Sequence, residues 1–347
     1  MKPAIQKAKR DIRKRWVLGA MGAFAVACIA ATQVHAEVNE IKITKQPGML
    51  YAQIVIMEHR KLLEKHTAAA GMADFKPSWI RFSSGGAATD ALLAGSVDIV
   101  TSGVSNLLLL WGRTNGEVKG VAAVGGTPIF LMSRNPDVKT IKDFGPKDRI
   151  ALPTIKVSMQ ATILGMALEK AYPGEAGANE KLLTTQVQLG HPEATAAVVN
   201  PTHEINAHFS NPPYQQLALK TPGVHIVLDS IDVMGGPHHI TTAFATTKFH
   251  DANPKVMKAF LAAFDEASAI IKNDPRGAAE SYLAITGEKF TVDELAALMS
   301  ANGALFQAAP VRTKMYADYM HRAGYIKQKA ESWKDYFFSD IHDRDGS

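Results

Sequence analysis

Short β-rich runs alternate with helical patterns along the body of this chain, and this alternation restricts the fold more than any other feature. The first series of predicted strands covers residues 41–44, 79–82, 97–100, 118–124 and 129–132. Predicted helices between them cover residues 50–65, 85–93 and 107–111. Strands and helices that alternate in this way are typical of α/β proteins. We therefore expect an α/β fold.

Two breaks rich in turn-forming residues divide the alternation into parts. They are Ser133-Arg134-Asn135-Pro136 and Met234-Gly235-Gly236-Pro237. The series between them has predicted strands at 149–152, 186–189, 204–208 and 225–228, and predicted helices at 158–170, 192–199 and 213–219. A strand at 240–246 follows the second break, and the rest is helical. We expect two lobes joined by two crossovers, one formed by residues 37–133 plus 237–347 and the other by 134–236.

Cap signals mark two helices of the C-terminal part. Asn253 precedes Pro254, which predicts a helix capped by Asn253 with Pro254 at its first position. Thr291-Val292-Asp293-Glu294 matches a capping box. The last five residues are polar, and we expect them to be frayed.

Residues 1–36 have the three parts of an export signal. A basic stretch ends at Arg15, an apolar stretch runs over residues 16–31, and the small-residue site Val34-His35-Ala36 precedes Glu37. The apolar stretch is short for a membrane span, and no basic flank follows it. We expect cleavage after Ala36 and a periplasmic product. An uncleaved anchor, and a lipoprotein attached through Cys28, are the alternatives.

The leader also explains the chain's basic character. The chain has 38 Lys and Arg against 33 Asp and Glu, but residues 1–36 hold seven of the basic residues and one acidic residue. The remaining chain is nearly neutral, which argues against nucleic-acid binding. Cys28 is the one cysteine of the chain. A product cleaved after Ala36 therefore has no disulfide, no cysteine metal ligand and no catalytic thiol.

One segment resembles a known family. Residues 85–100 contain an Ala-Leu-x-x-Gly-x-x-Asp pattern formed by Ala91, Leu92, Gly95 and Asp98. This pattern is similar to the second βαβ step of type II periplasmic solute-binding proteins. Together with the leader and the later Ile141-Lys142-Asp143-Phe144, it resembles the nitrate/sulfonate/taurine branch of ABC-transporter binding proteins. The resemblance implies two lobes, each a mixed sheet flanked by helices, with a ligand cleft between them.

The ends of the first-lobe strands offer groups that suit a small solute. In open α/β sheets, ligands bind beyond the carboxyl ends of the strands. Glycines there allow close approach to the backbone, and free amides at helix starts favour an anion. The alternative is that these residues are ordinary caps and turns. The candidate ligand-binding residues of this lobe are Gln46, Ser83, Ser84, Gly85, Gly86, Ser102 and Thr127.

The second lobe repeats the pattern with fewer candidates. Thr154 and Ser158 follow the strand at 149–152, and Asn211 and Tyr214 follow the strand at 204–208. Tyr214 could stack on a solute or donate a hydrogen bond to it, or it could simply begin a helix after an Asn211 cap. Lys156 is a possible counter-charge. No arginine stands in these loops, so no bidentate clamp on a carboxylate is visible.

Signatures of catalysis and of metal binding are weak. The chain has no G-x-S-x-G, P-loop or dinucleotide motif. His203 and His208 are five residues apart, one more than in a metalloprotease helix. His238 and His239 are adjacent, and neighbouring residues of a strand point to opposite faces. We expect no metal, no cofactor and no enzyme activity, and leave open whether either of these adjacent histidines reaches the cleft.

These features predict a function in transport. We expect a monomeric solute-binding protein that captures a small anion, such as a sulfonate, taurine or nitrate, and delivers it to ABC permease subunits in the inner membrane. The alternative is an enzyme on the same two-lobed fold that acts on a pyrimidine or an aromatic acid. An exported adhesin or a partner of a chemoreceptor is a third class. The cleft loops disfavour dianions, and stacking on Tyr214 leaves neutral aromatic ligands open.

Overall fold

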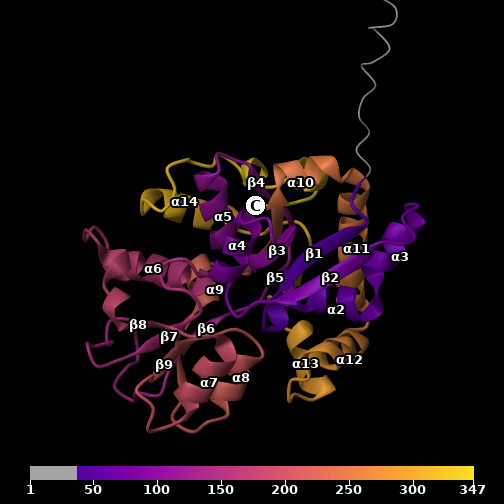
Figure 1. Ribbon diagram of the computed structural model, residues 1–347. Coiled ribbons are helices and arrows are strands. Elements are labelled where there is room, and N and C mark those ends of the chain that lie inside the picture. The colour runs from indigo at the N-terminus through magenta and orange to yellow at the C-terminus, as the bar shows by residue number, and fades with distance from the viewer. Residues whose placement is uncertain (1–36) are drawn as a thin grey trace, which may run out of the picture. The chain divides into compact units, whose positions relative to one another are not determined.

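Two five-stranded mixed sheets organise residues 37–347, the part of the chain that the computed structural model describes (Figure 1). Helices flank both sheets, as expected for the α/β fold with two sheets. The predicted export signal and the lipidation alternative at Cys28 lie outside the described residues. Within residues 37–347, no helix is both long enough and apolar enough to span a membrane.

The first sheet has the strand order β2-β1-β3-β11-β4. Its strands are β1 (Glu40–Lys45), β2 (Lys76–Arg81), β3 (Ile99–Gly103), β4 (Val118–Ala123) and β11 (Thr241–Thr246). β1, β2 and β3 are parallel, while β11 runs antiparallel to both β3 and β4. The helices connecting the first strands are α2 (Ala52–Arg60), α3 (Leu62–Ala69), α4 (Gly85–Leu93) and α5 (Val104–Arg113).

Burial patterns explain the position of these strands. β1 alternates between exposed and buried positions, with Ile41 and Ile43 fully buried. β3 and β11 lie inside the sheet, and nearly all of their residues are buried. Strands covered on both faces need continuous apolar or small side chains, which these two supply.

The second sheet has the order β10-β6-β9-β7-β8. Its strands are β6 (Phe130–Ser133), β7 (Ile150–Leu152), β8 (Gln186–Gln188), β9 (Ala207–Phe209) and β10 (His225–Asp229). β7, β8 and β9 are parallel, and β6 is antiparallel to β9 and β10. Its helices are α6 (Met159–Ala171), α7 (His191–Val199), α8 (Tyr214–Leu219) and α9 (Ser230–Met234).

The pairing of β6 differs from the sequence expectation. Residues 129–132 were expected in the first lobe, whose first segment was expected to end at residue 133. β6 instead pairs with β9 and β10 of the second sheet. The change of sheet occurs just before it, around β5 (Gly125–Gly126), which pairs with β12 (Leu305–Phe306). A run of apolar residues does not indicate which sheet it joins, because that depends on pairing with distant strands.

The helix expected at 50–65 is also interrupted. It begins with a 3₁₀ turn (Met49–Tyr51) and then divides into α2 and α3. Lys61, between the two, has a φ of 52° and ends α2 in the left-handed conformation. The apolar periodicity continues across the break, so the sequence pattern did not reveal it.

The C-terminal part is mostly helical. It contains α10 (Thr247–Ala252), α11 (Pro254–Asn273), α12 (Pro275–Thr286), α13 (Val292–Met299) and α14 (Thr313–Arg322). Pro254 begins α11, and the capping box at Thr291 and Glu294 is confirmed. The Asn253 side chain does not cap α11. Glu37 does so instead, because its Oε2 accepts hydrogen bonds from the amides of Lys255 and Val256 at 2.8 and 3.0 Å.

The end of the chain is held by several contacts, so the expectation of a frayed tail is wrong. The backbone of Ser347 pairs with Pro310 and Thr313 at 2.8 Å each. Arg344 makes a bidentate ion pair with Asp265 of α11, in which each of two guanidinium nitrogens donates to one carboxylate oxygen at 2.7 Å. Polar composition alone predicted fraying, whereas these partners, distant in sequence, hold the tail in place.

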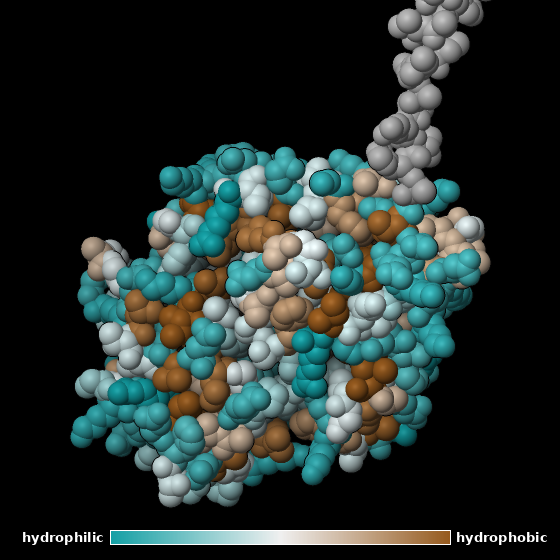
Figure 2. All heavy atoms as spheres, viewed as in Figure 1, coloured by the Kyte–Doolittle hydropathy of each residue, from teal (hydrophilic) through white to brown (hydrophobic). Residues whose placement is uncertain are grey.

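The surface is largely hydrophilic on the face seen in Figure 2, with apolar side chains in small groups among polar ones. Among the described residues, the large apolar side chains classed as exposed are Val38, Leu93, Leu217 and Ile226. Single exposed apolar residues of this kind are normal for a protein in water.

Candidate functional site

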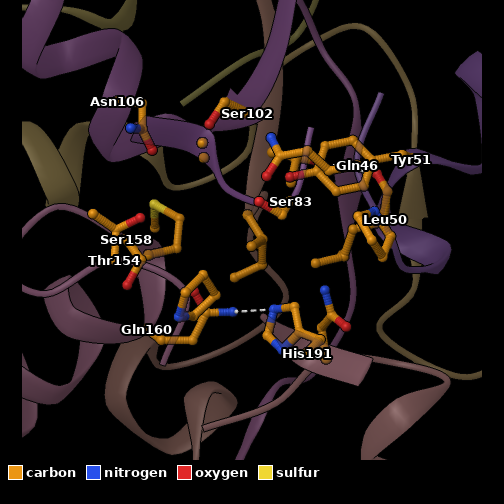
Figure 3. Close-up of a pocket in the computed structure, with 18 residues that line it drawn as sticks. Gln46, Leu50, Tyr51, Ser83, Ser102, Asn106, Thr154, Ser158, Gln160 and His191 are labelled. Atoms are coloured by element: carbon orange, nitrogen blue, oxygen red, sulfur yellow. Dashed lines mark hydrogen bonds between the residues drawn. The ribbon is translucent and has the colours of Figure 1, made fainter. Parts of the chain in front are cut away.

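A cavity lies where the carboxyl ends of strands from both sheets face each other (Figure 3). The space between its walls is about 500 Å³, part of which opens to solvent. First-sheet elements contribute Gln46, Pro47, Leu50, Tyr51, Ser83, Gly85, Ser102, Gly103, Asn106, Ile240 and Thr241. Second-sheet elements contribute Pro153, Thr154, Ser158, Met159, Gln160, His191 and Asn211.

Four helices begin at this cavity. α4 begins at Gly85, α6 at Met159 and α7 at His191, and each of these residues lines the wall. α5 follows directly after Gly103, which also lines it. Free amides and the helix dipole give each helix start a partial positive charge. The cavity is therefore surrounded by groups that favour an anion.

Amides at two of these helix starts have no partner. Within the described residues, the amides of Gly85, Gly86, Met159 and Gln160 make no hydrogen bond. The serine before each helix satisfies a deeper amide, since Ser84 Oγ accepts from Ala87 and Ser158 Oγ accepts from Ala161. The first amides of α4 and α6 thus remain available to a bound group.

The wall carries no lysine, arginine, aspartate or glutamate. Its polarity comes from hydroxyl, amide and imidazole groups. Three buried oxygen atoms of the wall have no hydrogen-bond partner among the described residues: Ser102 Oγ, Thr154 Oγ1 and Asn211 Oδ1. Buried polar atoms are rarely left unpaired, so unpaired atoms gathered at one cavity indicate a polar ligand or bound water.

Two glycines make room for these polar groups. A Cβ placed on Gly85 would lie 2.1 Å from Ser102 Oγ. A Cβ placed on Gly48, whose φ is 116°, would lie 2.8 Å from Asn211 Nδ2. Any side chain at either position would push these groups out of place, and the left-handed conformation of Gly48 adds strain to a substitution there.

Hydrogen bonds hold the first-sheet side of the wall. The Gln46 side chain donates to Thr101 O at 2.7 Å. Thr44 and Thr101 are fully buried and joined by two further hydrogen bonds between β1 and β3. These bonds fix the ends of both strands, from which Gln46 and Ser102 project.

A buried chain of polar groups forms the second-sheet side. Gln160 Nε2 lies 3.4 Å from His191 Nε2, as the dashed line in Figure 3 shows. His191 Nδ1 lies 3.1 Å from Nε2 of His208, which is fully buried in β9. Burial lowers the pKa of His191 to about 4 and also lowers the pKa of His208 well below its usual value. Both rings are therefore uncharged at neutral pH.

Tyr214 lies behind this chain rather than in the cavity wall. Its ring stacks on His191 at 6.1 Å between ring centres, with 12° between the planes. Its hydroxyl donates to Glu288 Oε1 at 2.6 Å. Tyr282 donates to the other oxygen of Glu288 at 3.2 Å. Burial raises the pKa of Glu288, and the two hydroxyl donors partly oppose that rise.

Seven of the eleven residues predicted from the sequence line the cavity. They are Gln46, Ser83, Gly85, Ser102, Thr154, Ser158 and Asn211. The four others lie outside the wall. Ser84 caps α4, and Tyr214 occupies the layer behind His191. A Cβ placed on Gly86 would face Thr154 at 3.6 Å. Thr127 is buried away from the cavity, with its hydroxyl unpaired.

The loop containing Thr127 has a packing role. A Cβ on Gly125 would lie 2.2 Å from Leu50 O, and one on Gly126 would lie 2.3 Å from His238 O. Both glycines therefore admit protein backbone rather than a solute. The sequence expectation failed here because close approach of a backbone and close approach of a ligand need the same residue.

Lys156, His238 and His239 all lie outside the cavity wall. Lys156 pairs with Glu180 at 2.9 Å and is not part of the wall. His238 and His239 are buried outside the cavity, with ring nitrogens bonded to the backbone of Gly236 and Val311. Within residues 37–347, no three His, Cys, Asp or Glu side chains gather as a metal site would require.

Several wall residues could not be identified from the sequence. Asn106, Gln160 and His191 lie within or at the start of helices, where a polar residue usually reads as exposed or as a cap. The start of α7 was expected at residue 192, one position after His191. Pro192 supports that expected start, because proline is preferred at the first helical position, but the helix begins one residue earlier and so places His191 at the cavity.

The sequence comparison agrees with this architecture. A model of the NMT1-like family matches residues 35–285. The chain belongs to the NMT1-like family. No curated protein sequence matches it.

Solved structures show that this NMT1-like chain has the periplasmic binding protein fold. The alkanesulfonate-binding protein SsuA from Xanthomonas axonopodis pv. citri, bound to MOPS, is 17% identical with a TM-score of 0.66, covering 85% of this chain and 96% of its own. The periplasmic aliphatic sulphonate binding protein SsuA from Escherichia coli is 18% identical with a TM-score of 0.64, covering 87% and 93%. The periplasmic nitrate-binding protein NrtA from Synechocystis PCC 6803 is 15% identical with a TM-score of 0.62, covering 86% and 84%. These likenesses confirm the resemblance inferred from residues 85–100.

Proposed function

We propose that this NMT1-like protein is the extracytoplasmic solute-binding component of an ABC importer. In this proposal it captures a small anion with a sulfonate- or nitrate-like group between two lobes and delivers it to the permease. The names of structurally similar proteins, which bind alkanesulfonates and nitrate, support this assignment. Periplasmic location, signal cleavage and a monomeric state are parts of the same proposal.

One observation carries the proposal. The cavity wall has no charged side chain, yet helices begin around it and amides at the starts of α4 and α6 are unpaired. A helix start favours an anion by roughly 0.3–2 kcal/mol. Several such contributions suit a singly charged oxyanion. A dianion would need formal positive charge to balance its second negative charge, and a wall without charged side chains does not supply it.

The lobes are proposed to close on the solute. We place the two crossovers at residues 124–129 and 234–240, because the chain changes from one sheet to the other next to these segments. The first is earlier than expected from the sequence because β6 belongs to the second sheet. Hinge closure around a ligand is a common motion of binding proteins.

The test is a calorimetric panel on the chain beginning at Glu37. We expect ethanesulfonate, taurine or nitrate to bind, and hydrogen phosphate and phosphate esters to bind at least tenfold more weakly. Buffers must contain no sulfonate, because MOPS and related buffers are themselves candidate ligands. Absence of binding heat with every monoanion would contradict the proposal.

A second candidate function rests on Asn211 and His191. The Asn211 amide is 2% exposed, its Oδ1 is unpaired, and its amide matches the donor–acceptor edge of a pyrimidine. His191 could move a proton at such a ligand, as an enzyme acting on a pyrimidine or aromatic acid would require. Uracil and benzoate belong in the same panel, and NMR of the incubated mixture would reveal any product.

A further inference from the structure

His191 is the one side chain of the cavity wall that can acquire a positive charge. Of the residues lining the cavity, only His191 and Tyr51 are ionisable, and a tyrosine can only become negative. A solute anion bound here would therefore meet partial charges and a single imidazole. The protonation state of His191 therefore affects how the negative charge of a bound anion is balanced.

The surroundings of His191 allow an added proton to be shared. Its Nδ1 lies 3.1 Å from His208 Nε2, so one ring donates to the other in the uncharged pair. Its Nε2 faces the Gln160 side chain at 3.4 Å, and an amide can present either its oxygen or its nitrogen. A protonated His191 would donate through Nδ1 to His208 and through Nε2 to the Gln160 oxygen or to the solute.

Other ionisable groups near the pair are few. Within the pair, His208 faces His191 from β9, and outside it the Tyr214 ring of α8 stacks on His191. Glu193 lies two residues further along α7. Besides burial, the charges of Glu288, Arg81 and Glu193 influence the pKa of Tyr214. No ion pair involves either histidine among the described residues, so a charge on the pair has no partner in the protein until an anion arrives.

We propose that binding of an anionic solute draws one proton from solvent onto the His191–His208 pair. The proton adds to a ring-nitrogen lone pair, no bond of the solute is broken, and the solvent loses one proton. The bound state thus contains its own counter-charge, while the empty state avoids a buried cation. Repulsion between the two adjacent rings limits the uptake to one proton.

The linkage predicts how affinity changes with pH. Burial holds the pKa of His191 at about 4 in the empty protein, and a nearby anion raises it in the complex. At pH values between the pKa of the empty protein and the higher pKa of the complex, Kd should decrease about tenfold for each unit by which pH falls. Above the pKa of the complex, Kd should not depend on pH.

The experiment measures Kd and proton uptake together. Sodium ethanesulfonate and sodium nitrate are titrated into the protein by calorimetry at half-unit steps from pH 5 to 7.5. Proton uptake is followed with an indicator dye in weakly buffered solution. We expect uptake of up to one proton per bound anion, increasing as pH falls, together with the steep change in Kd.

Variants assign the proton to the pair. His191→Asn and His208→Gln each keep a hydrogen-bonding group near the lost nitrogen but leave one ring of the pair, so each should reduce uptake. The double variant leaves neither ring to be protonated and should abolish uptake. Should the double variant fail to fold, the reduced uptake of the single variants and the wild-type pH profile still decide the question. Exposed His59 provides the matched control, and His59→Asn should leave uptake unchanged. Glu288→Gln should also keep it, which separates the pair from the carboxyl behind Tyr214.

The inference rests on the proposed anion-binding function, and the two can fail separately. An anion that binds with no proton uptake and a pH-independent Kd would overturn the inference and leave the function standing. Uptake that persists at the wild-type level in the double variant would also overturn it. No binding heat with either anion at any pH would contradict the proposed function and the inference together.

Discussion

The Tyr214 hydroxyl donates a 2.6 Å hydrogen bond to Glu288 Oε1, which joins α8 of the second-sheet region to the loop that follows α12. Lys220 and Glu294 form a second bridge between the same regions at 2.7 Å. A third contact, from Met49 N to Pro212 O at 2.9 Å, lies beside the cavity. Together they span the boundary between the regions of the two sheets on one side of the site.

We expect Tyr214→Phe to weaken the closed state. The change removes the hydrogen bond to Glu288 but keeps the ring stacked on His191. Loss of a hydrogen bond to a buried partner costs about 1–3 kcal/mol, so solute affinity should fall roughly 5- to 150-fold. Calorimetry measures the affinity, and small-angle scattering with and without solute measures the closure.

Tyr282→Phe is the matched control for that prediction. Tyr282 bonds to the other oxygen of Glu288 but lies six residues away in α12, so its bond does not cross between the regions. It should lower stability with little effect on affinity. Equal losses of affinity in both variants would contradict a bridging role for Tyr214.

Cavity hydroxyls should matter more than equally buried hydroxyls elsewhere. Ser102→Ala removes an unpaired oxygen of the wall and should weaken solute binding by about 1–3 kcal/mol. Thr127→Val removes an oxygen that is also buried and unpaired but lies outside the cavity, and it should leave affinity unchanged. Calorimetry, with circular dichroism as a check on folding, decides between them. A larger effect at Thr127 would show that the cavity is not the binding site.

Stability should decrease as pH falls from about 6.5 toward 5. Burial lowers the pKa of His191 and of His238 to about 4, and that of His239 to about 3, from an ordinary value of 6.5. The unfolded chain therefore binds more protons than the folded one in this range, and the stabilisation is fully present only above about pH 6.5. Each such histidine should contribute a slope of up to about 1.4 kcal/mol per pH unit.

Denaturant unfolding of the solute-free protein at several pH values tests this dependence. His208→Gln should reduce the slope, since burial also lowers the pKa of His208. His59→Asn changes an exposed histidine and should leave the slope as it is. A stability that rises on acidification through this range would be inconsistent with uncharged buried histidines.

Glu37 should stabilise α11, the longest helix of residues 37–347. Its carboxylate accepts hydrogen bonds from two amides at the start of α11, a contact from the other end of the described chain. Glu37→Ala should lower the free energy of unfolding by about 0.5–2 kcal/mol. Glu40→Ala, at an exposed position of β1, serves as the control and should change it little. Urea unfolding of both variants makes the comparison.

Export should remove residues 1–36. The succession of basic, apolar and small residues predicts cleavage after Ala36. N-terminal sequencing of protein recovered from the periplasm should begin at Glu37. A protein that begins at a lipidated Cys28 would disprove this prediction.

Local signals in the sequence were sufficient for much of the fold. The alternation of strands and helices predicted the α/β class, and Ser83-Ser84-Gly85-Gly86 predicted the start of α4 with its free amides. Such features depend on residues within one turn of each other, because caps and free amides at a helix start are formed by the local backbone and its nearest side chains. The same reasoning placed Ser102 and Thr154 at or just after strand ends and Ser158 before the following helix, and all three line the cavity.

Tertiary structure alone decided which of these local features meet. β6 joins the second sheet through partners 74 to 99 residues later in the chain. Gly125 and Gly126 have the same chemistry as Gly85, yet they admit protein backbone, while Gly85 admits the Ser102 hydroxyl of the wall. His191 became a candidate only because α7 begins at the cavity and β9 places His208 behind it. A glycine or a histidine has the same local preferences wherever it occurs, and its role depends on the neighbours that long-range packing brings to it.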